Sequence, residues 1–214
     1  FDLKKAPNVT RVDCSRADEE TVLRWIYTRM RRAGVACNTD CCERIMRYCL
    51  GSMSRIATET EKLLAYAGQG GTLTAEDVDA VVYRDTDYKI YEMTDALGRG
   101  NYGAYLSVMN ELLGKGMDEA GVLNSLCNYF RTMYEILALN KSDADTAKAL
   151  GMKEYAVKMS RRQAKLLGVT KVETSYFAIF GAVNAVKSGK MTPQGALTSV
   201  NAMLFFGMKE NNAC

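Results

Sequence analysis

Apolar side chains recur every three or four positions along most of the chain, which is the spacing of one face of a helix. This pattern predicts an all-α fold. The expected helices cover about residues 16–33, 39–50 and 53–67, a short segment after Thr74, and then 87–98, 101–114, 118–140, 143–150, 153–167, 171–188 and 192–206.

Polar residues and glycines mark where these helices begin and end. Ser15 is predicted to cap the first helix, with Asp18 three residues further on, and Gly34 to end it. Thr74 and Asp77 have the spacing of a capping box, in which each residue hydrogen-bonds the backbone of the other. These signals are local, so they predict helix limits without any knowledge of the tertiary structure.

The helices are predicted to form two domains. The polar stretch "YRDTDY", residues 83–88, suits a boundary between a small helical domain over 15–86 and a larger one over 87–214. Residues 1–14 contain the one convincing strand-like stretch near the start, "KKAPNVTRVDC". Because a lone strand is unstable unpaired, and because the chain begins at Phe1, we expect a piece of a longer protein.

Composition narrows the class of protein. The chain has 214 residues, of which 48% are hydrophobic and 25% are charged, so a globular protein with a real core is expected. The net charge of +3 is too close to balance to argue for nucleic-acid binding by itself. No apolar run reaches about 18 residues without a charge, so no membrane span is predicted.

The seven cysteines raise the question of zinc, because Cys37, Cys41, Cys42 and Cys49 lie close together. However, the chain has neither a C-x-x-C pair nor a histidine, the usual components of a structural zinc site. Cys42 and Cys49 instead share helical spacing with Ile45 and Met46, as on a buried helix face. Reduced thiols in a cytoplasmic protein are therefore the favoured interpretation, and zinc stays as an alternative.

The stretch "GRGNYG" contains a G-x-G-x-x-G pattern, formed by Gly98, Gly100 and Gly103. A dinucleotide fingerprint needs a buried strand in front of it. Here "DYKIYEMTDAL" precedes the glycines, and its apolar residues have helical spacing. The glycines are therefore predicted to join two helices, and no cofactor is expected.

The sequence does not assemble a catalytic site. It contains no histidine, no G-x-x-x-x-G-K-[ST] phosphate loop and no G-x-S-x-G motif. The pairs Asp85 with Asp87 and Asp143 with Asp145 stand at predicted helix starts, where the helix dipole accounts for them. The basic residues Arg161, Arg162 and Lys165 are interpreted as a solvated helix edge, with phosphate contact as the less favoured alternative.

An ordered series of motifs identifies a family. "DALGRGNYGAYLSVMNELLGKGMDEAGVLNSLCNYFRTMYEILALNK" and "AKALGMKEYAVKMSRRQAKLL" resemble the C-terminal domain of the delta subunit of the bacterial DNA polymerase III clamp loader. "NAVKSGK" extends the resemblance, although Asn184 stands where that family usually has aspartate. The positions that carry it are Asp95, Phe130, Arg131, Lys141, Gly151, Tyr155, Lys158, Gln163, Lys187 and Gly189, expected to be structural.

The resemblance covers about residues 9–207 and implies an architecture. "CSRADEETVLRWIYTRMRRAGV", "LGSMSRIATETEKLLAYAG" and "LTAEDVDAVV" are similar to the family's small AAA+-type lid domain. Residues 87–214 would then be the helical collar that joins the subunits. Residues 1–14 resemble the last strand of the family's N-terminal domain, which is otherwise expected to be absent.

The resemblance also implies a function and partners. The chain is expected to be part of a clamp-loader subunit that helps to load the sliding clamp onto primed DNA and is not an enzyme by itself. The implied partners are the gamma/tau and delta-prime subunits through the collar, and the clamp through the N-terminal domain. An unrelated helical scaffold or adaptor, and a metal protein built on the cysteines, are the alternatives.

The collar implied by the resemblance needs an exposed apolar surface that other subunits cover. The candidates are Phe177, Phe180, Phe205 and Phe206. A helical domain of this size also needs aromatic core residues, so the same four side chains could instead be buried. Phe130 and Arg131 are expected to tie helices together and not to be catalytic.

Overall fold

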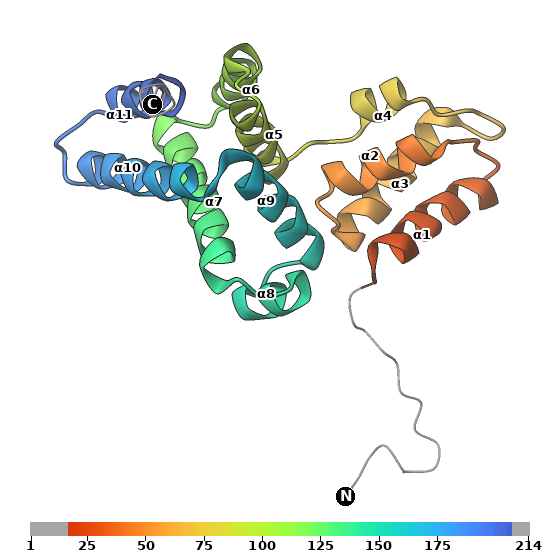
Figure 1. Cartoon of the computed structure of the whole chain (residues 1–214). Coiled ribbons are helices and arrows are strands. Elements are labelled where there is room, and N and C mark those ends of the chain that lie inside the picture. The colour runs from red at the N-terminus through yellow and green to blue at the C-terminus, as the bar shows by residue number, and fades with distance from the viewer. Residues whose placement is uncertain (1–16, 207–214) are drawn as a thin grey trace, which may run out of the picture.

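The computed structural model describes residues 17–206, which form eleven helices in two groups (Figure 1). The N-terminal module contains α1 (Glu19–Arg32), α2 (Thr39–Tyr48), α3 (Met53–Ala67) and α4 (Ala75–Val81). The C-terminal module contains α5 (Thr86–Gly98), α6 (Tyr102–Gly114), α7 (Glu119–Leu139), α8 (Asp143–Leu150), α9 (Glu154–Leu167), α10 (Val169–Lys187) and α11 (Pro193–Phe205). The all-α prediction is confirmed for this part of the chain.

The first helix begins later than predicted. Asp18 is its N-cap and accepts a hydrogen bond from the backbone N–H of Thr21 at 2.7 Å, so α1 starts at Glu19 and not near residue 16. An aspartate at this position satisfies one of the free N–H groups of the first turn. Ser15 and the predicted strand over residues 1–14 lie outside the described residues.

The N-terminal module packs around a compact apolar core. The side chains of Ile26, Ile45, Ile56 and Leu63 are fully buried there, one or two from each of α1, α2 and α3. The loops after α1 and α3 are joined by a single parallel bridge, in which Ala36 N–H donates to Gly71 O at 2.9 Å and Ala36 O accepts from Leu73 N–H at 2.8 Å. This bridge holds α1 and α3 at a fixed spacing.

The predicted capping box at the start of α4 is confirmed. Thr74 Oγ1 accepts from the backbone N–H of Asp77 at 3.2 Å, and Asp77 Oδ2 accepts from the backbone N–H of Thr74 at 2.8 Å. A cap of this kind compensates for the shortness of a seven-residue helix, which would not be stable alone.

The C-terminal module is built around α7, its longest helix. In Figure 1 α7 runs through the centre of the module, and α5, α6, α9, α10 and α11 all pack against it. Its buried side chains, among them Leu123, Leu126, Phe130 and Met133, therefore fill the core of the whole module.

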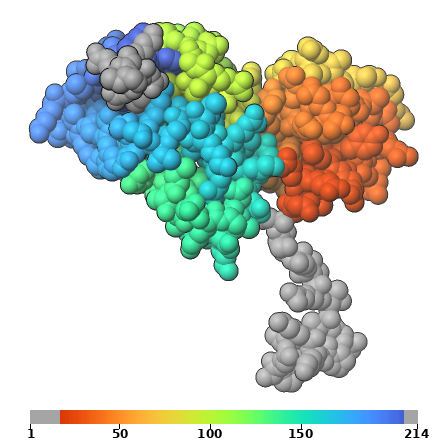
Figure 2. Space-filling model, in the orientation of Figure 1, coloured from red at the N-terminus to blue at the C-terminus, as the bar shows by residue number. Residues whose placement is uncertain are grey.

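The two modules form two lobes that meet in the middle of the molecule (Figure 2). Each has its own cluster of buried side chains, but Tyr88 and Tyr91 of α5 and Met159 of α9 belong to the cluster of the N-terminal module. The two clusters favour the predicted division at residues 86 and 87, which stays a prediction. The contact between the modules, called the seam below, is formed by α1, α2 and the turn after α2 on one side and by α5, α8 and α9 on the other.

Within residues 17–206, no single helix has both the length and the apolar composition needed to cross a membrane. In this part of the chain, only α9 and α10 taken together meet that test, and they are bent by 101° relative to each other.

Candidate functional site

A cluster of aromatic side chains lies on the surface of the C-terminal module. It consists of Tyr134 from α7 and Tyr176, Phe177 and Phe180 from α10, and is called the aromatic face below. The ring centres of Tyr134 and Tyr176 are 5.7 Å apart, and those of Tyr176 and Phe177 are 5.1 Å apart. Phe177 and Phe180 are 53% and 46% exposed, far above what a core phenylalanine shows.

The aromatic face contains only two of the four predicted phenylalanines. Phe205, at the end of α11, is half-buried against Tyr102 and Tyr105 of α6, with ring centres 4.5 and 5.1 Å apart. Phe206 is exposed beside Tyr102. The helical spacing of α10 could have added Tyr176 to the prediction. Tyr134 could not be found from sequence, because only the packing of α7 on α10 brings it there.

Gln163 is the family-motif position with the clearest structural role. Its side chain is 1% exposed, and its Oε1 lies 2.8 Å from both Thr94 Oγ1 of α5 and Tyr129 Oη of α7. Its Nε2 donates to the backbone O of Tyr91 at 2.8 Å. One amide from α9 thus satisfies polar groups on two other helices inside the core, which fixes the three helices relative to one another.

Four more motif residues lie along α5, α7 and the loop that follows α7. Asp95 pairs with Arg99 at 2.7 Å, and Phe130 is fully buried in the core of the C-terminal module. Arg131 is exposed and lies 3.8 Å from Glu135 on its own helix. The backbone O of Lys141 accepts from Arg161 Nη2 at 2.8 Å. Phe130 therefore joins helices through the core, whereas Arg131 is on the surface.

Two motif residues are glycines that end helices. Gly151 follows α8 with φ of +66°, and Gly189 lies just after α10 with φ of +71°, a left-handed conformation that strongly favours glycine. Lys187, in the last turn of α10, is exposed at the negative end of the helix dipole.

The other two motif residues, Tyr155 and Lys158, form part of the seam. Lys158 pairs with Glu19 of α1. Gly51, in the turn after α2, has φ of +65°, and a Cβ placed on it would lie 2.9 Å from Tyr155 Cβ. The two modules therefore touch at a point where only a glycine fits.

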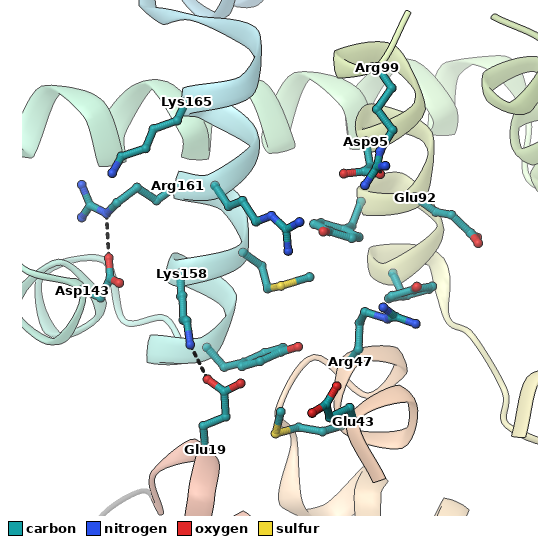
Figure 3. A pocket seen from close by; sticks show the side chains of 16 residues that line it. Glu19, Glu43, Arg47, Glu92, Asp95, Arg99, Asp143, Lys158, Arg161 and Lys165 are labelled. Atoms are coloured by element: carbon teal, nitrogen blue, oxygen red, sulfur yellow. Dashed lines mark hydrogen bonds and ion pairs between the residues drawn. The ribbon is translucent and has the colours of Figure 1, made fainter. Parts of the chain in front are cut away.

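A cavity of about 790 Å³ opens in the seam, and charged side chains line most of it (Figure 3). Arg47 of α2 lies on one wall; Lys158, Arg161, Arg162 and Lys165 of α9 lie on the other, with the i, i+3, i+4, i+7 spacing of one helix face. Arg161 Nε donates to Asp143 Oδ1 at 2.6 Å. The predicted basic edge of α9 therefore faces this cavity.

Three tyrosine rings also line this cavity. Tyr88 and Tyr91 of α5 are buried, and Tyr155 of α9 is half-buried. Burial raises the pKa of all three phenols, so they stay neutral at physiological pH. The cavity charge therefore comes from carboxylates, arginines and lysines alone.

The glycines of the G-x-G-x-x-G pattern join two helices, as predicted. Gly98 is the last residue of α5, Gly100 has φ of +68° and Gly103 lies in the first turn of α6. A helix, and not a strand, precedes them. A dinucleotide fingerprint requires a strand at this place, so this segment does not have the setting of one.

The clustered cysteines lie in the N-terminal module. Cys42 and Cys49 are buried, as their helical spacing predicts, and Cys41 is buried as well. Cys37 Sγ lies 3.9 Å from Cys42 Sγ, and this hydrogen bond lowers the pKa of Cys37 to about 7. Across residues 17–206, no three Cys, Asp or Glu side chains are grouped so that they could hold a metal ion.

Comparison with known proteins identifies the C-terminal module. Residues 87–201, just over half of the chain, match the family described as DNA polymerase III delta subunit, C-terminal domain. A curated relative, the probable DNA polymerase III subunit delta of Aquifex aeolicus, is 23% identical over 152 residues, which are 69% of this chain and 43% of that protein.

A solved structure shows the same fold. The Bacillus subtilis DNA clamp loader delta protein matches with a TM-score of 0.81 at 18% identity, over 95% of this chain and 60% of that one. The chain thus spans about half the length of these two relatives.

These matches define the class of protein as a two-module helical chain whose larger module is a delta-type C-terminal domain. The chain belongs to the DNA polymerase III delta subunit family. The resemblance seen in the sequence is therefore confirmed, and the alternative of an unrelated helical scaffold is disfavoured.

Proposed function

We propose that this chain acts as part of a clamp-loader subunit of the DNA polymerase III holoenzyme, which helps to load the sliding clamp onto primed DNA. The observation that carries the proposal is the family match over residues 87–201, the stretch that forms α5–α11. The name of the Bacillus subtilis relative, a DNA clamp loader delta protein, points the same way.

In this proposal the chain contributes assembly and not catalysis. The C-terminal module joins the collar of the complex, and the gamma/tau and delta-prime subunits are its partners there. The clamp would be held by the family's N-terminal domain, and primed DNA would be met only in the assembled complex. Any polymerase activity belongs to the holoenzyme.

The aromatic face is the surface of this chain best suited to collar assembly. Exposed aromatic side chains grouped on one face are typical of the buried centre of protein interfaces. Phe177 and Phe180 lie on the outer side of α10, while the core of the module is filled by other residues such as Phe130. They can therefore be covered by a partner without any change in the core.

The proposal is tested by measuring mass by light scattering after gel filtration, for the chain alone and mixed with the gamma/tau and delta-prime collar domains. We expect a defined hetero-oligomer. The double variant Phe177→Asp with Phe180→Asp should stay alone in the same mixture, because a charge in the centre of an apolar interface is left unpaired.

A matched control is Tyr27→Asp, which places the same charge on an aromatic residue that is 48% exposed on α1 of the N-terminal module. This variant should still form the complex. If the chain forms no complex at high micromolar concentration, the proposed function is contradicted; if the aromatic-face variant assembles as the parent does, the interface lies elsewhere.

A further inference from the structure

The cavity in the seam contains cations that the protein itself leaves without a counter-ion. Lys158 is paired with Glu19, Arg161 with Asp143, and Arg99 with Asp95. By contrast, Arg162 and Lys165 make no hydrogen bond or ion pair with any described residue, although they stand on the same face of α9. The basic face of α9 is therefore only half neutralised.

Arg47 adds a third cation from the opposite wall. Its Nε atom is buried and has no hydrogen-bond partner within residues 17–206. Its guanidinium carbon lies 5.5 Å from the centre of the Tyr48 ring, and the side chain also interacts with the Tyr48 hydroxyl, so Nε is the donor left available to an acceptor. A buried donor without an acceptor is costly, so an oxygen-rich ligand would be stabilised here.

The carboxylates that line the cavity do not balance these cations. Glu19, Asp95 and Asp143 have the partners given above, and Glu92 lies 3.1 Å from Arg84 and 3.3 Å from Lys89. Glu43 is the only lining carboxylate without an ion pair to a described residue. Three cations thus face one free carboxylate, and Figure 3 shows Arg47 and Lys165 on opposite sides of the opening.

We infer that this cavity is a binding site for phosphate groups, carried by a nucleic-acid strand or by a free nucleotide, with Arg47, Arg162 and Lys165 as its cationic contacts. Arginine forks match phosphate oxygens geometrically, and lysine adds a point charge. The volume of about 790 Å³ exceeds what a single phosphate needs and lies in the range of small-ligand sites. Tyr155 offers a half-buried ring against which a base could stack.

The test is fluorescence anisotropy of a labelled single strand of about ten nucleotides, titrated with the chain at several salt concentrations. We expect saturable binding that weakens with salt. The double variant Arg162→Gln with Lys165→Gln should bind about tenfold more weakly, because it loses two charge-assisted contacts. The slope of the logarithm of the binding constant against the logarithm of the salt concentration should be smaller in magnitude by about 1.4, since each single-strand phosphate contact contributes about 0.7.

The matched control is Arg31→Gln with Arg32→Gln, which removes the same charge from two exposed cations at the end of α1 that have no ion pair to a described residue. If this control weakens binding as much as the cavity variant does, strand binding is a general effect of charge and the inference is overturned. The single variant Arg47→Gln should weaken binding as well, because it removes the buried donor.

Competition identifies the source of the phosphate. A nucleoside triphosphate that displaces the strand at micromolar concentration would assign the site to free nucleotides, and failure to displace would assign it to strands. An oligoglutamate peptide that displaces the strand equally well would overturn the phosphate assignment. The aromatic-face variant should bind the strand as the parent does, so this inference and the proposed function fail or hold separately.

Discussion

The core of the C-terminal module and the seam between the modules are held together in different ways. Inside the module, α5, α7 and α9 meet through buried apolar side chains and through Gln163, whose amide oxygen and nitrogen both hydrogen-bond other helices. In the seam, by contrast, a charged cavity separates much of α2 from α9. The contacts there are the packing of Tyr88, Tyr91 and Met159 against the N-terminal module, an exposed ion pair and one close approach at Gly51. Opening the seam should therefore cost less free energy than unfolding the core of the C-terminal module.

The chain offers a simple way to measure the two regions separately. Trp25, its single tryptophan, lies on α1, so its fluorescence reports on the N-terminal module. Circular dichroism reports on all helices, most of which belong to the C-terminal module. The two signals recorded during urea unfolding distinguish a local effect from a global one.

The largest effect is expected from Phe130→Ala, which removes a fully buried ring from the centre of the C-terminal module. The cavity left behind should cost about 3–5 kcal/mol of the free energy of unfolding. The midpoint from circular dichroism should fall while the Trp25 midpoint moves much less. Phe177→Ala, on the exposed aromatic face, is the control and should change both midpoints little. Equal shifts of both midpoints in Phe130→Ala would show that the modules unfold as one.

Gln163→Leu should have the next largest effect. The substitution keeps the volume but removes the acceptor of Tyr129 Oη at 2.8 Å and one of the donors to the backbone O of Tyr91. We expect a loss of about 2–3 kcal/mol by circular dichroism. Gln163→Glu keeps the acceptor for Thr94 and Tyr129 but loses the donor to Tyr91; a Leu variant as stable as the parent would refute the structural role of the amide.

Gly51→Ala tests the seam itself. Any alanine in this left-handed conformation costs about 1 kcal/mol, and here its Cβ also collides with Tyr155. Gly70→Ala is the control, because Gly70 has φ of +78° and no atom within 4 Å of a new Cβ. We expect only Gly51→Ala to increase the radius of gyration measured by X-ray scattering; equal radii in the two variants would mean that the seam tolerates the collision.

The smallest effect is expected from Lys158→Ala. Its pair with Glu19 is solvent-exposed, with 59% and 41% of the two side chains accessible, so the interaction is worth at most about 0.5 kcal/mol. A double-mutant cycle with Glu19→Ala, read by Trp25 fluorescence at low and high salt, measures it. A coupling free energy above about 1 kcal/mol at high salt would contradict this expectation, because it would show that the ion pair stabilises the seam more than an exposed pair should.

The positions of the helices were predictable because their signals are local. Thr74 and Asp77 cap α4 with contacts three residues apart, and glycines end α1, α3 and α8 close to where the sequence pattern stops. The start of α1 was missed because Ser15 and Asp18 are both good caps, and the sequence alone does not show which one hydrogen-bonds the first turn. Such competition shifts a boundary by a few residues but does not change the fold class.

What the sequence by itself determined is the all-helical fold, the order of the helices and the family, since each depends on spacing along the chain. Only the tertiary structure decided that Tyr134 joins Tyr176, that Gln163 joins three helices, and that Arg47 faces the basic edge of α9. These pairs are separated by tens of residues, and helical periodicity gives the face on which a side chain lies but not the helix it meets. Contacts between helices depend on how whole surfaces fit, which no local pattern records.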